Sequence, residues 1–156
     1  ETYWSRFENI WFHGDYVYVD QDNLWYMRGR TDDVINTSGH RLSTAEIEHA
    51  IISHKKISDA AAIAIPDDIV GEAIVVFFVT HDRSETGLES EISNYISDKI
   101  GKVARPKYVF QLSDLPKTRT GKIMRRLLKS KLLGMELGDL SSLENTHVLN
   151  EIPKLN

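Results

Sequence analysis

Cysteine is absent from this 156-residue chain, and proline occurs only four times. Without cysteine the chain can form neither a disulfide framework nor a thiolate metal site, and a reducing compartment is its simplest setting. No apolar run approaches the roughly 18 residues that a membrane-spanning helix needs. The opening residues, ETYWSRFENI, lack the basic start and the apolar core of a signal peptide. We therefore expect a soluble, cytoplasmic protein with no membrane partner.

The remaining composition is ordinary for a globular domain. Hydrophobic residues make up 41% of the chain and charged residues 27%, with a formal net charge of -4 at pH 7. This length suits one domain with a hydrophobic core and is short for two. Because the chain begins with Glu and reads like the middle of a domain, we expect it to be a fragment of a larger protein.

The N-terminal third has the pattern of a β-hairpin followed by a polar joint. Aromatic and β-branched residues fill positions 16–19 and 24–27, and turn-forming Asp and Asn residues separate these runs. The polar RGRTDD that follows suits a joint between two bodies. Ser43 then stands three residues before Glu46 at the head of an apolar stripe, a capping-box pattern that predicts a helix of about three turns.

Two apolar runs, residues 60–65 and 73–79, predict adjacent antiparallel strands joined by PDDIVG. The second run is apolar on both faces, so it should lie in the middle of the sheet. Three further elements are predicted: a helix over 86–100 opened by a capping box of Thr86 and Glu89, a strand over 107–112, and a helix over 121–133.

This order of elements predicts an α+β fold, in which a small, mostly antiparallel sheet is flanked by helices and preceded by a β-hairpin. Residues 32–133 would form the compact domain, and residues 1–31 the hairpin and the approach to it. Residues 134–156 show no sustained period, so we expect a C-terminal tail that is loosely ordered or docked on a partner.

The stretch PKTRTGKIMRR, residues 116–126, gathers five cationic side chains around one glycine. We expect Lys122 in the first turn of the third helix, with Thr120 as a candidate N-cap. The unpaired amides of a helix start favour anions, and a lysine beside them suits a phosphate or a carboxylate. A solvated, basic helix face is the simpler interpretation of most of the other cations.

Asp15 and Arg30 are candidates for contacts with a nucleotide. Asp15 follows Gly14, and a carboxylate that accepts two hydroxyl hydrogen bonds can clamp a ribose diol, although it can equally stabilise a turn. Arg30 can fork onto phosphate oxygens, although its mixed-charge neighbourhood also suits an exposed loop.

Gly39, His40 and Arg41 stand just before the first predicted helix. A glycine lets backbone approach a ligand closely, and Arg41 would bring positive charge to the same place. His49 and His54 lie five residues apart with no third ligand nearby, so we predict no metal site.

Taken together, three stretches resemble the adenylate-forming acyl-CoA synthetases, most closely their acetyl-CoA and short-chain branch. They are GD at 14–15, GRTDDVINTSGHRLSTAEIE at 29–48 and PKTRTGKIMRR at 116–126, in the family's order and spacing. The resemblance covers only the end of such an enzyme. Family members also have a large N-terminal domain with a Ser/Thr/Gly-rich phosphate loop and the acyl pocket, so this chain alone should be inactive.

The resemblance implies a two-step ligase that uses ATP, Mg2+ and coenzyme A. A carboxylate and ATP form an acyl-adenylate with release of pyrophosphate, and the acyl group then passes to the thiol of coenzyme A. By motif, Lys122 would bridge the carboxylate and the α-phosphate. Asp15 would hold the ribose hydroxyls, and Arg30 and Arg41 would contact the nucleotide.

The resemblance also implies a rotation of the small domain about a hinge at Asp32, at the start of residues 32–133. Gly39, His40 and Arg41 would then line the coenzyme A path. A lysine acetyltransferase and a deacetylase acting on Lys122 are implied as partners, since acetylation removes the charge. Where related acetate enzymes carry an arginine that helps to bind coenzyme A, this sequence has Ser97, with Lys102 and Arg105 nearby.

Two other functions remain open from the residues alone. The basic stripe over 117–131 could serve a small nucleic-acid-binding module with strongly salt-dependent affinity, although the acidic net charge counts against it. A regulatory interaction module modified at lysine is the other.

Overall fold

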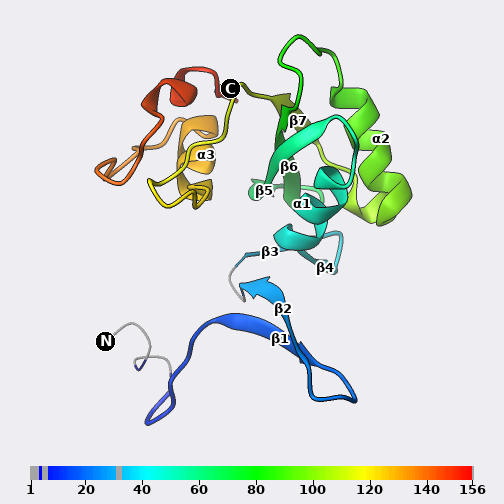
Figure 1. Ribbon diagram of the computed structural model, residues 1–156, viewed down its shortest axis with the longest axis vertical. Coiled ribbons are helices and arrows are strands. Elements are labelled where there is room, and N and C mark those ends of the chain that lie inside the picture. Colours follow the sequence, from blue (N-terminus) through cyan, green and yellow to red (C-terminus); the bar gives the residue numbers. More distant parts are fainter. Residues whose placement is uncertain (1–3, 5–6, 31–32, 156) are drawn as a thin grey trace.

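The computed structural model describes residues 4, 7–30 and 33–155, and it begins with a two-stranded hairpin. β1 (Asp15–Val19) pairs antiparallel with β2 (Trp25–Arg30), as predicted. The Asp20 carboxylate closes the turn by accepting the N–H groups of Asp22 and Leu24, both at 2.9 Å. Figure 1 shows this hairpin standing apart from the larger body that follows.

The larger body is built on a five-stranded sheet with the order β4-β3-β6-β5, in which β7 also pairs with β6. The strands are β3 (Val34–Thr37), β4 (His40–Ser43), β5 (Ile57–Asp67), β6 (Gly71–Thr80) and β7 (Tyr108–Gln111). All pairs are antiparallel except β6 with β7. Because β6 pairs with β3, β5 and β7, the prediction of a central second strand is confirmed.

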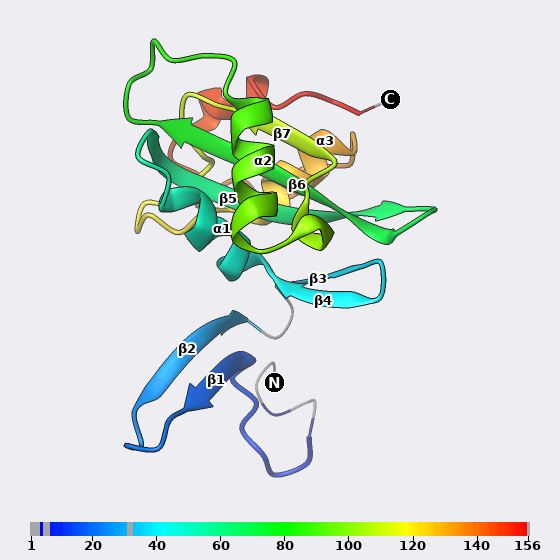
Figure 2. The ribbon, with the colours of Figure 1, turned by 90° about the vertical axis from the view of Figure 1, so that its right-hand side faces the viewer.

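Helices cover both faces of this sheet, which confirms the predicted α+β class (Figure 2). α1 (Thr44–Ile52) and α2 (Glu89–Lys99) pack on one face, and α3 (Arg125–Leu132) packs on the other. Two short 3-10 helices, η1 (Lys102–Ala104) and η2 (Thr146–Asn150), complete the elements.

β6 supplies buried side chains to both layers, which is why its run is apolar on both faces. Val75, Phe77 and Val79 belong to the core on the α3 side. Ile74, Val76 and Phe78 belong to the core beneath α1 and α2. The sheet therefore separates two hydrophobic layers, each of which is packed against one of its faces.

The start of the third helix was predicted wrongly. α3 begins at Arg125 rather than at residue 121, because the Met124 N–H donates to the Pro116 carbonyl at 2.7 Å and residues 117–123 first close a turn. Thr120 therefore caps no helix. α2 likewise begins at Glu89, after Leu88 at the N-cap, without a side-chain capping bond.

The hairpin of β3 and β4 was not predicted, since TSGHRL was interpreted only as a glycine turn before a helix. Ile35 and Leu42 face each other in its register and are buried beneath α1. Ser38 and Gly39 form its two-residue turn, with φ values of 49° and 77°.

The prediction of a loose or partner-docked C-terminal tail was wrong. Leu143, Val148, Leu149 and Ile152 are buried in the same core as α3. In Figure 1 this orange and red segment lies beside α3. Residues 134–155 are thus part of the domain's own packing.

Candidate functional site

Lys122 closes a tight turn, with Arg119, Thr120 and Gly121 at its tip, that precedes α3. The Thr118 N–H donates to the Lys122 carbonyl at 2.9 Å, and the Lys122 N–H donates to the Thr118 hydroxyl at 3.1 Å. Gly121 adopts φ 82°, which an L side chain rarely accepts. The side chain of Lys122 is exposed, and within the described part of the chain its ammonium makes no hydrogen bond or ion pair. The turn therefore holds the backbone and presents a free positive charge.

Among the cations around Lys122, Arg119 and Arg126 are exposed, as expected, whereas Lys117 and Arg125 form internal ion pairs. Lys117 binds Asp59 at 2.8 Å and Asp114 at 3.0 Å. Burial lowers the pKa of Lys117, but the hydrogen bonds to these two carboxylates outweigh it and raise the pKa overall. The internal pairing leaves little of a continuous stripe for nucleic acid, and that alternative is not supported.

Arg125 makes the strongest internal ion pair of the stretch. Its Nε and Nη2 donate to the two oxygens of Glu48 at 2.8 and 2.6 Å, and its Nη1 lies 3.9 Å from the Asp33 carboxylate. The hydrogen bonds to Glu48 raise the pKa of Arg125 further above its usual value. This role was not predicted from the sequence, because Arg125 and Glu48 are 77 positions apart and come together only in the fold.

Asp15 and Arg30 meet at the open end of the first hairpin, where their backbones are register partners. Arg30 Nη1 lies 3.7 Å from the Asp15 carboxylate and donates to the His13 carbonyl at 3.2 Å. The His13 ring also contacts the Asp15 carboxylate. Two of the three predicted nucleotide residues are thus brought together, and His13 joins them without having been predicted.

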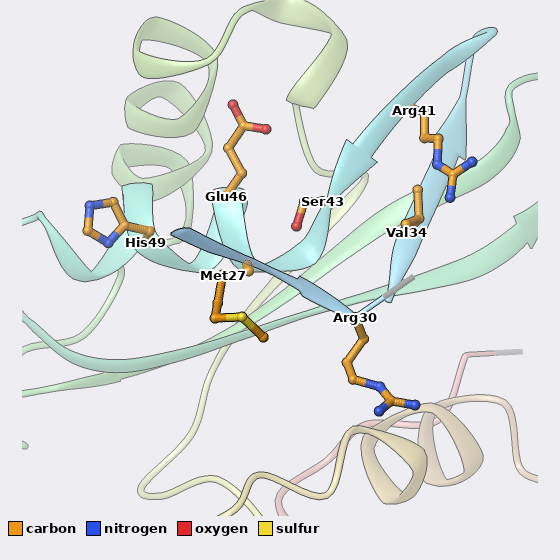
Figure 3. Close-up of a pocket in the computed structure, with 8 residues that line it drawn as sticks. Met27, Arg30, Val34, Arg41, Ser43, Glu46 and His49 are labelled. Atoms are coloured by element: carbon orange, nitrogen blue, oxygen red, sulfur yellow. The ribbon is translucent and has the colours of Figure 1, made fainter. Parts of the chain in front are cut away.

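A cavity of about 640 Å³ opens between β2, the β3–β4 hairpin and the start of α1. In Figure 3, Arg30 comes from β2 and its side chain points away from Glu46 and Ser43, while Arg41 comes from the β3–β4 hairpin; both are among the residues that line the cavity. Its other lining residues mix apolar and titratable side chains: Met27, Val34, Ser43, Ala45, Glu46 and His49. Two guanidinium groups beside apolar surface suit a ligand that is anionic at one end and apolar at the other.

Gly39 and His40 are exposed at the tip of the β3–β4 hairpin. The ring of His40 approaches the Ser38 carbonyl at 3.1 Å, and a Cβ built on Gly39 would meet nothing within 4 Å. The tip is held by the β5–β6 turn, because the Ser38 N–H donates to the Val70 carbonyl at 2.9 Å.

The structure does not bring Lys122 to the cavity residues. Ile123 and Met124, next to Lys122, pack in the α3 layer. Leu42 packs in the layer of α1 and α2, and because side chains alternate along a strand, its neighbour Arg41 faces the other side of the β3–β4 hairpin, where it lines the cavity. Lys122 is not among the residues that line this cavity.

Asp32 lies outside the described residues, but its neighbour is firmly held. The Asp33 carbonyl accepts both the backbone N–H and the hydroxyl of Thr44 at 3.2 Å. Ser97, at the position that differs from the family pattern, donates its hydroxyl to the Ser93 carbonyl at 3.0 Å.

The described residues lack two further features, a cluster of metal ligands and a membrane-spanning helix. They contain no group of three or more His, Cys, Asp or Glu side chains arranged to hold a metal ion. They also contain no helix long and apolar enough to cross a membrane.

Comparisons with known proteins agree with the resemblance seen in the sequence. Over 156 residues the chain is 43% identical to the acetyl-coenzyme A synthetase of Cronobacter sakazakii, covering 97% of this chain and 24% of that protein. It is 39% identical over 155 residues to the acetyl-coenzyme A synthetase of Methanothrix thermoacetophila, covering 98% and 24%. The chain thus spans about a quarter of the length of these curated relatives.

The fold is shared with a solved enzyme. The ATP-bound MatB from Rhodopseudomonas palustris superposes with a TM-score of 0.75 at 25% identity, covering 83% of this chain and 26% of MatB. Residues 46–122 match the family described as "AMP-binding enzyme C-terminal domain". The matched residues run from the start of α1 to Lys122, and the chain belongs to the family of AMP-binding enzyme C-terminal domains.

Proposed function

We propose that this chain is the C-terminal lid of an ATP-dependent acid–thiol ligase. The enzyme would form an acyl-adenylate from a short-chain carboxylate, with acetate as the first candidate, and pass the acyl group to coenzyme A. The phosphate loop and the acyl pocket would lie in a larger N-terminal domain, which ends with the hairpin of residues 1–31. We place the enzyme in the cytoplasm.

The observation that carries this proposal is the exposed Lys122 ammonium on a hydrogen-bonded turn. In the first half-reaction a carboxylate oxygen bonds to the α-phosphorus while the bond to the pyrophosphate oxygen breaks. Two anions must approach each other, and a fixed ammonium stabilises the charge that accumulates. Lys122 can serve this step because no carboxylate in the described residues neutralises it.

The β3–β4 hairpin would serve the second half-reaction. Rotation about a hinge at Asp32 would withdraw Lys122 and bring in the hairpin that carries Gly39, His40 and Arg41. Its open glycine tip would let the pantetheine chain pass, and the Arg41 guanidinium would meet a phosphate. Arg41 lines the cavity and Lys122 does not, and this separation supports the division of labour.

Asp15 would hold the ribose hydroxyls, and Arg30 would contact the nucleotide phosphate. Their mutual contact supports a shared role at one ligand. Mg2+ would neutralise charge on the ATP phosphates when bound. The described residues offer it no cluster of acidic ligands, so we assign it to the larger domain.

The exposure of Lys122 also supports regulation by a lysine acetyltransferase and a deacetylase. Acetylation would convert the ammonium into a neutral amide and remove the charge that adenylation requires.

Acetate-dependent exchange of labelled pyrophosphate into ATP tests the proposal. We expect exchange by the full-length protein that contains this chain and none by the chain alone. Lys122→Ala in the full-length protein should slow exchange by about 100-fold or more, while thioester formation from supplied acyl-adenylate continues. Arg119→Ala, which removes an exposed cation from the same turn, is the matched control. Equal loss of both half-reactions in Lys122→Ala would refute the assigned role.

A further inference from the structure

The C-terminal segment, residues 134–156, lies beyond the family match, which ends at Lys122. It nevertheless runs along the base of the turn that presents this lysine. Thr118 and Leu143 form an isolated antiparallel bridge, and the Glu144 N–H donates to the Lys117 carbonyl at 3.0 Å. The first residues of the lysine turn are therefore paired with this segment as with a neighbouring strand.

Asn145 makes three hydrogen bonds at this base. Its Nδ2 donates to the Asp114 carboxylate at 2.8 Å and to the Leu115 carbonyl at 2.7 Å. Its Oδ1 accepts the Lys117 backbone N–H at 3.0 Å. One amide side chain thus joins three of the four residues that lead into the turn.

These bonds determine where Lys122 is presented. Lys117 pairs with Ile123 across the turn, so fixing Lys117 fixes both ends of the loop. The Lys117 ammonium is itself held by Asp59 and Asp114, and Asp114 is a partner of Asn145. Without Asn145, the Lys117 amide and the Leu115 carbonyl would lose their partners.

The segment that carries Asn145 is anchored on both sides of it. Leu143 lies on one side, and Val148, Leu149 and Ile152 lie on the other, all buried in the α3 layer. Glu151 adds a polar anchor, since it accepts the Ser113 N–H at 2.8 Å and the Ser113 hydroxyl at 2.5 Å. Asn145 is therefore held in place by anchored residues on both sides of it.

We propose that Asn145 is a positioning residue for adenylation, which holds the Lys122 turn at the geometry that the first half-reaction needs. This inference rests on the proposed function of Lys122. It predicts that the C-terminal segment is required for the first half-reaction and not for the second.

The test compares Asn145→Ala with Asn150→Ala in the full-length protein. Asn150 is an exposed asparagine of the same segment, so its truncation is a matched control. In Asn145→Ala, backbone amides of residues 117–124 should exchange with deuterium about tenfold faster or more, with those of β5 and β6 unchanged. Pyrophosphate exchange should fall by about 100-fold, while thioester formation from supplied acyl-adenylate stays within about twofold of the unmutated protein.

A pair of substitutions that exchanges the amide of Asn145 with the carboxylate of Asp114 tests the hydrogen bond between them without truncating either side chain. Asn145→Asp places a carboxylate against Asp114 and should also slow pyrophosphate exchange. Adding Asp114→Asn restores one donor–acceptor pair, and part of the activity should return. Absence of any recovery would contradict the assigned bond.

Two other results would overturn the inference. Unchanged deuterium uptake over 117–124 in Asn145→Ala would show that Asn145 does not hold the turn. Equal loss of both half-reactions would show a general structural role. If the unmutated full-length protein forms no adenylate, the proposed function fails, and deuterium uptake alone then decides whether Asn145 holds the turn.

Discussion

Gly39 is the residue at which backbone conformation and the proposed chemistry can be separated most cleanly. It needs a positive φ of 77°, yet a Cβ there would meet nothing within 4 Å inside the domain. Any specific effect of a larger residue must therefore come from something that approaches the tip from outside. In the proposed function that object is the pantetheine arm of coenzyme A.

Gly39→Leu is expected to lower the free energy of unfolding by about 1–2 kcal/mol, because the left-handed conformation disfavours an L side chain. It should block thioester formation while pyrophosphate exchange continues. Gly87→Leu is the matched control, since Gly87 has φ 76° and equally open surroundings on another loop. Denaturant unfolding and assays of the two half-reactions measure both effects. Normal thioester formation in Gly39→Leu would contradict the placement of the coenzyme A path.

At the scale of elements, the Arg125–Glu48 pair closes an edge of the sheet. β5 is the last strand in the order, and the Glu48 carboxylate accepts its Ala62 N–H at 2.9 Å. Arg125, at the start of α3, reaches the same carboxylate from the other layer. The pair thereby covers an exposed strand edge and ties together the helices on opposite faces.

Arg125→Ala is expected to lower the free energy of unfolding by about 2–3 kcal/mol, because it leaves the largely buried Glu48 carboxylate without its main partner. The free energy of unfolding of Arg125→Lys should lie between those of Arg125→Ala and the unmutated protein, because an ammonium cannot reproduce the forked contact. Lys131→Ala removes a cation from the same helix and should change stability by less than about 0.5 kcal/mol. Urea denaturation measures all three. Equal stability of Arg125→Ala and Lys131→Ala would show that the pair contributes nothing.

Elements with a strong local period could be predicted from the sequence, and those that depend on distant partners could not. The alternating and apolar runs identified β5 and β6, and helical spacing identified α1 and α2. The start of α3 depends on a bond between Met124 and Pro116 that no local pattern shows. The β3–β4 hairpin did leave a signal, because the turn formers Ser38 and Gly39 separate two short runs that each contain at least one apolar residue.

The candidate site likewise contains residues that could be predicted from the sequence and residues that could not. Lys122, Asp15, Arg30 and Arg41 are visible as motif residues, and the structure shows how the last three are grouped. Asn145 and Glu48 could not be found, because their role lies in contacts with residues that are 28 to 77 positions away. Supporting residues of this kind carry no composition or spacing that distinguishes them.

At the scale of the whole molecule, the two layers and the sheet between them form one body, which carries Lys122 and the cavity-lining Arg41 at separate places. The C-terminal segment, which has no period, completes the α3 layer by supplying four of its buried apolar side chains. Removing this segment would therefore expose the core beside α3 as well as release the Lys122 turn.

Acid stability is also a property of the whole body, since several aspartates far apart hold turns or ion pairs. The pKa is lowered at Asp20, Asp67, Asp82, Asp114 and Asp139. For Asp67 the hydrogen bond from Lys107, and then those from the Val70 and Ile69 amides, lower the pKa from 3.8 to about 2. A carboxylate with a lowered pKa in the folded state stabilises the fold above its unfolded pKa.

The stabilisation from Asp67 should therefore be complete above about pH 4 and be lost as the pH falls through about 2. We expect the melting temperature of the protein to fall steeply over this interval. Asp67→Asn cannot form the ion pair with Lys107, so it should melt lower than the unmutated protein at pH 6, and the difference should shrink toward pH 2. Asp68→Asn, on the same turn, is the control and should melt closer to the unmutated protein at pH 6, because Asp68 has no hydrogen bond from Lys107 to lose. Thermal unfolding between pH 6 and pH 2 measures this, and a constant difference for Asp67→Asn would mean that its carboxylate is not stabilised as a charged group.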